Sequence, residues 1–202
     1  MSRAEGMSRA DANRRRILDV ALLELLRDPE ASMDQIARAA GVVRRTVYGH
    51  FPSREALIAA LVDDATAAVA EANAIAPGAD PAETLARRTL AVWEIADRYR
   101  LLIALARRSV TMEGIRQRLT PVRRELTGVL QQGLDEGVLT SQLSAEALSY
   151  VHEHVLYGLM EAVNDGVLAA EDAGRSAAVT ALTASGVPAV HATELVAGLS
   201  ST

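Results

Sequence analysis

The side chains whose types and spacing could do chemistry are concentrated between residues 44 and 54. They are guanidinium, hydroxyl and imidazole groups: Arg44, Arg45, Thr46, Tyr48, His50 and Arg54. A guanidinium can donate two hydrogen bonds to O6 and N7 of guanine, whereas hydroxyl and imidazole groups suit phosphate oxygens. If one short helix presents them, they have the chemistry of a DNA-contacting surface.

Two short helices separated by a tight turn are predicted to position this group. Ser32 stands three residues before Gln35, a capping-box spacing that predicts a helix through Ala39. Gly41 allows the positive φ needed where that helix ends, and residues 42–50 form the next one. This is the spacing of a helix-turn-helix unit. An ordinary helical hairpin uses the same turn, so the spacing alone leaves both interpretations open.

Each side chain of the group has a functional and a structural interpretation. Arg44 and Arg45 lie at the start of the second helix, the end that enters the major groove. Thr46 fits a phosphate, a thymine methyl group or a bond within its own helix. Tyr48 fits a phosphate contact or the core between helices, and His50 fits a phosphate contact.

Arg54 begins the following helix, behind Ser53 as its cap. The positive end of a helix dipole attracts phosphate, so Arg54 and the free amides after Ser53 are candidate phosphate contacts. Contact with solvent alone is the alternative for Arg54. The run Arg14-Arg15-Arg16 is typical of a solvated helix face, and contact with the DNA backbone is the alternative.

Residues 33–61 resemble the DNA-binding region of the TetR family of bacterial transcriptional regulators. The resemblance rests on Ile36-Ala37, Gly41-Val42, Thr46-Val47-Tyr48, His50-Phe51-Pro52, Ser53-Arg54 and Glu55-Ala56-Leu57. It implies an N-terminal three-helix unit that binds operator DNA. It also implies a C-terminal bundle that dimerises and binds a small effector, which releases the DNA.

Two positions depart from the family pattern. Val43 stands where a Ser or Thr cap is usual, and Gly49 stands where a longer polar or basic residue is common. Glycine inside a helix costs about 1 kcal/mol relative to alanine. These departures support an alternative function, a helical protein-interaction module that no longer binds DNA.

Composition restricts the class of protein. The 202 residues contain no cysteine, which excludes disulfide scaffolds and zinc–thiolate sites. The N-terminal residues do not resemble a signal peptide and no stretch is apolar enough to span a bilayer, so we expect a cytoplasmic protein without membrane contact. No catalytic motif or nucleotide fingerprint is found, so we predict neither an enzyme nor a cofactor. Residues 1–60 carry ten arginines against eight acidic residues, whereas the whole chain has a net charge of −5.

The apolar periodicity predicts an all-α protein of about nine helices. We place a helix-turn-helix DNA-binding domain at 10–55 and a ligand-binding and dimerisation domain at 56–202. The apolar stretch 101–110 is read as separate from the helix before it, and the last helix is expected to end near Gly186 and Pro188.

A stripe of aromatic and polar side chains marks the helix predicted at 145–164. Tyr150, His154, Tyr157 and Glu161 recur at helical spacing, which fits solvent, a subunit interface or a wet cavity. His152 and His154, two residues apart, point to different faces and do not suggest a metal site. The candidate pocket residues are Trp93, Met112, His154, Tyr157 and Met160.

The resulting hypothesis is a homodimeric repressor of the TetR type. Its predicted partners are double-stranded, palindromic operator DNA, a small-molecule effector and a second copy of the chain. A helix-turn-helix unit reads half a palindrome, which is why a two-fold dimer is expected, with its interface on the last two long helices.

Overall fold

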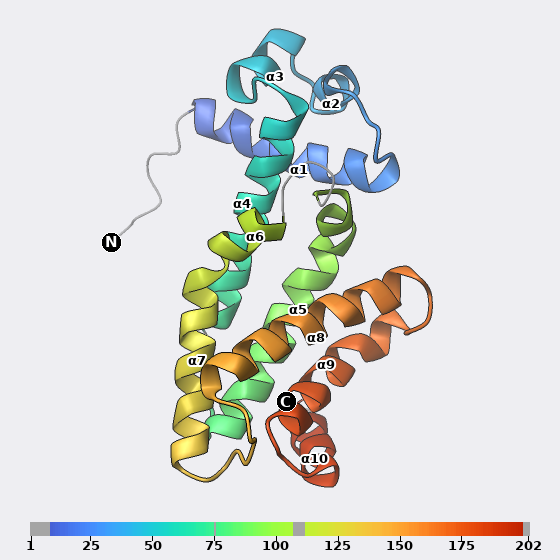
Figure 1. Cartoon of the computed structure of the whole chain (residues 1–202). Coiled ribbons are helices and arrows are strands. Elements are labelled where there is room, and N and C mark those ends of the chain that lie inside the picture. The colour runs from blue at the N-terminus through green and yellow to red at the C-terminus, as the bar shows by residue number, and fades with distance from the viewer. Residues whose placement is uncertain (1–8, 75, 107–111, 200–202) are drawn as a thin grey trace, which may run out of the picture. The chain divides into compact units, whose positions relative to one another are not determined.

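Ten α-helices and no strand are formed by the residues that the computed structural model describes, which are 9–74, 76–106 and 112–199. The helices are α1 (Arg9–Arg27), α2 (Met33–Ala39), α3 (Arg44–His50), α4 (Arg54–Asn73), α5 (Pro81–Ala106), α6 (Met112–Arg118), α7 (Thr120–Asp135), α8 (Ala145–Asn164), α9 (Ala170–Ala184) and α10 (Ala189–Leu199) (Figure 1). The all-α prediction is confirmed. The predicted total of about nine helices is one too low.

The contacts divide the chain into two units. One comprises residues up to Asp64 and the stretch from Leu101 to Ile115, and the other comprises 65–100 and 116–202. None of the ten helices is long and apolar enough to cross a membrane.

The first unit is built on α1, which packs against α2, and on α2, which packs against α3. The apolar face of α1 is buried through Ile17, Leu18, Ala21, Leu22 and Leu25. Each fully buried leucine or isoleucine side chain contributes about 1.5–3 kcal/mol to folding. This stripe holds α2 and α3 on a rigid base.

Local signals begin and end the two short helices. Ser32 Oγ accepts from the amide of Gln35 and the Gln35 side chain accepts from the amide of Ser32, which confirms the capping box. Gly41 adopts φ +63°, where a side chain would be strained, so the chain can leave α2 and enter α3. Ser53 Oγ accepts from the amide of Ala56 and caps α4.

The second unit is a bundle in which α7 packs on α8, α8 on α9, and α9 on α10. Its core draws one or more buried side chains from each of α5, α7, α8, α9 and α10. Its fully buried large members include Leu85, Leu130, Leu148 and Leu182. Ser144 caps α8 through the amide of Ala147.

The sequence analysis was wrong on the extent of one helix and missed another, whereas α9 ends just before Gly186 as expected. α5 continues through Arg100 to Ala106, because no glycine or proline interrupts it and Arg100 is a good helix former. Beyond Pro188, where an end was expected, the Pro188 carbonyl accepts from the amide of Ala192 and α10 begins. Proline suits such a helix start because it needs no amide hydrogen. The predicted segment 101–110 extends beyond the described residues at 107–110.

Candidate functional site

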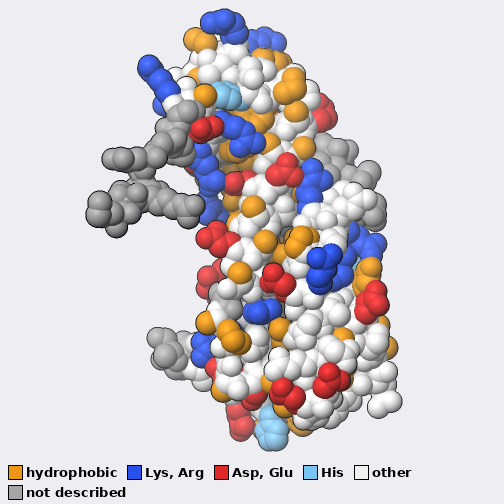
Figure 2. Space-filling model, turned by 90° about the vertical axis from the view of Figure 1, so that its left-hand side faces the viewer, with side chains coloured by type: hydrophobic (Ala, Val, Ile, Leu, Met, Phe, Trp, Pro, Cys, Tyr) orange, Lys and Arg blue, Asp and Glu red, His pale blue; other side chains and the backbone are white. Residues whose placement is uncertain are grey.

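The helix-turn-helix residues lie on a well-anchored scaffold. Ile36 and Val47 are fully buried and Ala37 is 3% exposed, so α2 and α3 cross through small and apolar side chains. The opposite face of α3 carries its polar groups. Figure 2 shows basic side chains on the surface over α2 and α3.

Arg44 is held in place by two groups. Its Nη1 donates to Asp34 Oδ2 at 2.8 Å, and its guanidinium carbon lies 5.0 Å from the centre of the Tyr48 ring. Its Nη2 also contacts the Tyr48 hydroxyl at 3.4 Å. The Arg44 side chain is 65% exposed, so the fixed guanidinium still faces solvent. An arginine held in this way loses less conformational freedom when it binds.

Arg45 has a different environment. It is exposed and has no hydrogen-bond or ion-pair partner among the described residues. Thr46 is half-buried, and its amide donates to the Val43 carbonyl at 2.8 Å. Val43 is 66% exposed and gives α3 no side-chain cap. The start of α3 therefore presents one free guanidinium beside an exposed apolar side chain.

The side chains of Arg54 and His50 contact other parts of the same unit. Arg54 Nε donates to the Ala31 carbonyl at 3.4 Å and its Nη2 donates to the Pro29 carbonyl, which ties α4 to the loop before α2. The half-buried His50 ring lies 6.2 Å from the ring of Phe51. Phe51 is 2% exposed and Arg14 lies over its ring. These contacts give Arg54 and His50 a structural role in the described part of the chain.

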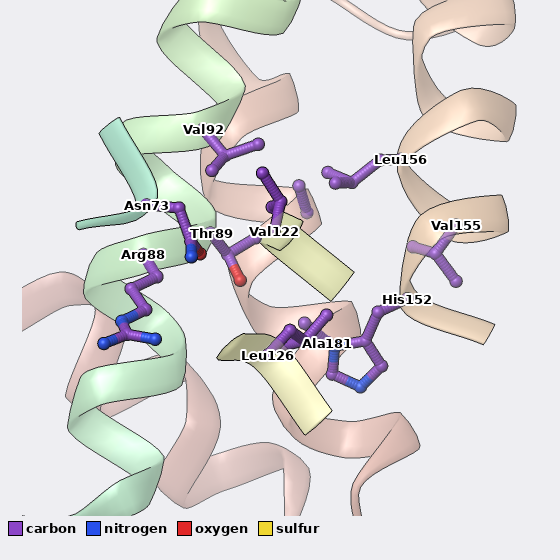
Figure 3. Close-up of a pocket in the computed structure, with 11 residues that line it drawn as sticks. Asn73, Arg88, Thr89, Val92, Val122, Leu126, His152, Val155, Leu156 and Ala181 are labelled. Carbon is purple, nitrogen blue, oxygen red and sulfur yellow. The ribbon is translucent and has the colours of Figure 1, made fainter. Parts of the chain in front are cut away.

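A cavity of about 60 Å³ lies within the second unit. We call it the His152 cavity. It is lined by Asn73 of α4, by Arg88, Thr89 and Val92 of α5, by Val122 and Leu126 of α7, by His152, Val155 and Leu156 of α8, and by Ala177 and Ala181 of α9 (Figure 3). Most of these side chains are apolar, and a few polar groups face the same space. That combination is typical of a small-molecule site.

Hydrogen bonds fix the polar groups of the His152 cavity. His152 is 4% exposed, and burial lowers its pKa to about 4, so the ring is neutral at pH 7. Ser185 Oγ donates its one proton to the Ala181 carbonyl at 2.9 Å, so it accepts from His152 Nε2, 2.9 Å away. Asn73 Nδ2 donates to Glu125 Oε2 at 2.7 Å. Arg88 Nε is buried and has no hydrogen-bond partner within the described ranges.

None of the five predicted pocket residues lines the His152 cavity. Trp93 is 5% exposed and packs on α9, where a Cβ on Gly174 would meet its Cδ1 at 2.9 Å. Met160 is also 5% exposed. His154 is exposed and its Nδ1 donates to the Tyr150 carbonyl at 2.8 Å. The Met112 side chain lies outside the described residues, and an effector contact by any of the five stays a prediction.

Tyr157 belongs to a buried polar cluster between α7 and α8. Arg123 donates from Nε and Nη2 to Glu153 Oε2 at 2.9 and 2.5 Å, and its guanidinium lies over the ring of Tyr150. Glu153 Oε1 and the Tyr157 hydroxyl are both buried and have no hydrogen-bond partner in the part of the chain that the structure describes. Burial, and then the charge of Glu153, raise the pKa of Tyr157 to about 12. The predicted stripe on α8 is thus partly a charged cluster and partly solvent-exposed.

Sequence reasoning missed Asp34, Asn73, Arg88 and the role of His152. Asp34 precedes Arg44 by ten residues, and only the helix crossing brings them together. The cavity residues come from five helices, so their proximity has no local pattern. The different environments of His152, buried, and His154, exposed, agree with the predicted opposite faces.

Comparisons with known proteins fit this geometry. The family described as bacterial regulatory proteins, tetR family, matches residues 17–61. The HTH-type transcriptional repressor LfrR of Mycolicibacterium smegmatis is 38% identical over 84 residues, which are 40% of this chain and 43% of that repressor. Because the aligned segment spans less than half of LfrR, the activity, ligands and partners of that protein reach this chain only as proposals.

Solved structures share the fold over nearly the whole chain. LfrR from Mycobacterium smegmatis in complex with proflavine has a TM-score of 0.64 at 22% identity, over 88% of this chain and 98% of that one. Salmonella enterica GusR has a TM-score of 0.66 at 22% identity, over 96% and 100%. FadR from Bacillus subtilis in complex with stearoyl-CoA has a TM-score of 0.69 at 18% identity, over 84% and 98%.

Proposed function

We propose that the chain is a transcriptional regulator of the TetR family, a homodimeric repressor that binds a palindromic operator and is released by a small-molecule effector. The proposal rests chiefly on the surface of α3. There a fixed guanidinium, Arg44, and a free one, Arg45, stand side by side on a helix whose opposite face is buried.

The two arginines suit different tasks. Arg45 has no competing partner, so it is the proposed base-reading residue, with guanine as its best match. Arg44 and Tyr48 form a positioned pair suited to a phosphate or a base edge. Thr46 and His50 are proposed as further phosphate contacts. Arg54 is proposed to act through the α4 start, because its own donors already bind carbonyl oxygens.

A two-fold dimer would supply the second half of a palindrome. We assign its interface to α8 and α9, which pack together as long helices at the C-terminal side of the bundle. Val167, in the loop between them, is 82% exposed, an apolar side chain that a partner would cover. The isologous geometry of such an interface places two identical recognition helices on one DNA face.

The effector site is proposed to be the His152 cavity. Relatives with this fold are known in complex with proflavine and with stearoyl-CoA. The α4 helix connects the two functions along the chain, since it begins at Arg54 beside α3 and its last residue, Asn73, lines the cavity. An effector that binds one arrangement of α4 more tightly would shift the protein toward it.

A gel shift with the DNA upstream of the chain's own gene tests this function. We expect a shifted complex whose mobility corresponds to two chains, and its loss on addition of an effector. A folded chain that shifts no specific fragment would instead support a protein-interaction module, for which the missing cap at Val43 is the structural argument.

A further inference from the structure

Two side-chain atoms that line the His152 cavity can accept a hydrogen bond from a ligand: Nδ1 of His152 and Oγ1 of Thr89. Ser185 accepts from His152 Nε2, so that nitrogen carries the proton of the neutral ring and Nδ1 carries a lone pair. Nδ1 has no partner among the described residues. Thr89 Oγ1 donates its proton to the Leu85 carbonyl at 2.8 Å, so toward the cavity it can only accept.

The donors of the same cavity belong to Asn73 and Arg88. Asn73 Nδ2 donates to Glu125, and the buried Nε of Arg88 has no hydrogen-bond partner among the described residues. Figure 3 shows Asn73, Arg88 and Thr89 on one side of the cavity and His152 on the other. The surface between them consists of valine, leucine and alanine side chains.

We propose that the effector is a small, mostly apolar, neutral molecule that carries a hydroxyl group, which donates to His152 Nδ1 or Thr89 Oγ1. This inference rests on the proposed function and names the chemical class of its effector. A hydroxyl oxygen also has lone pairs that Arg88 Nε can reach as a donor. A carboxylate has no proton to donate to His152 Nδ1 or Thr89 Oγ1.

The size of the cavity adds a requirement. About 60 Å³ is smaller than an engineered cavity of about 150 Å³ that holds benzene. A ring-sized molecule must therefore move the side chains that line the cavity, and the α4 residue Asn73 is one of them. Binding that requires such movement is what a conformational switch needs.

Three probes of one shape test the hydroxyl requirement: phenol, anisole and toluene. Phenol donates and accepts, anisole only accepts, and toluene does neither. We expect equilibrium dialysis against the full chain, without DNA, to show phenol binding about tenfold more tightly than toluene or anisole, because one added hydrogen bond contributes that much.

Two variants test which acceptor causes the preference for phenol over toluene. His152→Phe keeps an aromatic ring without the acceptor, and Thr89→Val keeps the shape of the side chain without its hydroxyl. At least one of them should reduce the phenol-to-toluene ratio to about one, with a thermal melt to check that each variant is folded. His191→Phe, an exposed histidine on α10, is the matched control and should keep the wild-type ratio.

Three results would overturn the inference: equal binding of the three probes, no binding of phenol, or a phenol preference that survives both variants in folded protein. Equal binding would still leave an apolar effector site in a DNA-binding regulator. Failure of the proposed function has a different signature, the absence of specific DNA binding in the gel shift.

Discussion

At the scale of single residues, Arg44 and Arg45 are adjacent in sequence but differ in environment. Asp34 and Tyr48 fix the first, whereas the second extends free from the same helix turn. Sequence reasoning predicted both arginines as a pair and could not distinguish them, because Asp34 comes from the other helix. On this difference we propose base reading for Arg45 and orientation for Arg44.

Substitution of Arg45 by alanine should weaken binding to a specific site by about 1–3 kcal/mol and relax the sequence preference. Fluorescence anisotropy on specific and random duplexes measures both. Asp34→Asn, which leaves Arg44 less firmly held, should reduce the discrimination between the two duplexes more than it reduces total affinity. An equal loss on both duplexes for Arg45→Ala would show a phosphate contact instead.

His152 predicts a pH dependence of stability. Its pKa falls from 6.5 in the unfolded chain to about 4 in the folded one. Between these two pH values the His152 ring is protonated in the unfolded state and neutral in the folded state. Stability from this group is complete above pH 6.5 and is lost as pH falls toward 4, by roughly 3 kcal/mol at most.

Urea unfolding at pH 7.5 and pH 5 measures this loss. His152→Gln should show a smaller loss than the wild type between the two values, whereas the exposed His191→Gln should behave like the wild type. Parallel losses in all three proteins would contradict the assignment to His152.

At the scale of elements, the sequence predicted correctly where helices begin if a capping side chain marks their first turn. The capping box of α2 and the Ser144 cap of α8 appear where expected. The seven-residue α6 and the proline-led α10 have weaker signals, and their formation depends on the packing around them. The cavity could not be predicted, because α4, α5, α7, α8 and α9 each contribute residues and only tertiary packing joins them.

Alanine substitutions at two glycines near α3 should change the stability of the protein in opposite directions. Gly41 sits at φ +63° with nothing within 4 Å of a new Cβ, so Gly41→Ala should destabilise the protein by about 1–2 kcal/mol through backbone strain alone. Gly49 is the last residue but one of α3 and has equally open space, so Gly49→Ala should stabilise the protein by at most about 0.5–1 kcal/mol.

Denaturant midpoints of the two variants, compared with the wild type, show whether each substitution stabilises or destabilises the protein. Each variant serves as the control of the other, since both add one methyl group to an open position. A stabilising Gly41→Ala would contradict the account of the turn between α2 and α3.

At the scale of the whole molecule, charge and symmetry matter together. Residues 1–60 are mildly basic in a chain whose net charge is −5, so attraction to DNA is expected from the residues of the first three helices and not from the protein as a whole. Contacts from a few arginines to phosphates release counterions, so affinity should fall linearly on a logarithmic scale as salt rises.

Selection of DNA from a random-sequence pool by the full chain tests the central claim most directly. We predict that the recovered duplexes share a two-fold symmetric consensus, bind two chains each and bind more weakly to the Arg45→Ala variant. Recovery of sequences without a consensus, by folded protein at low salt, would contradict sequence-specific recognition by α3 and with it the proposed repressor.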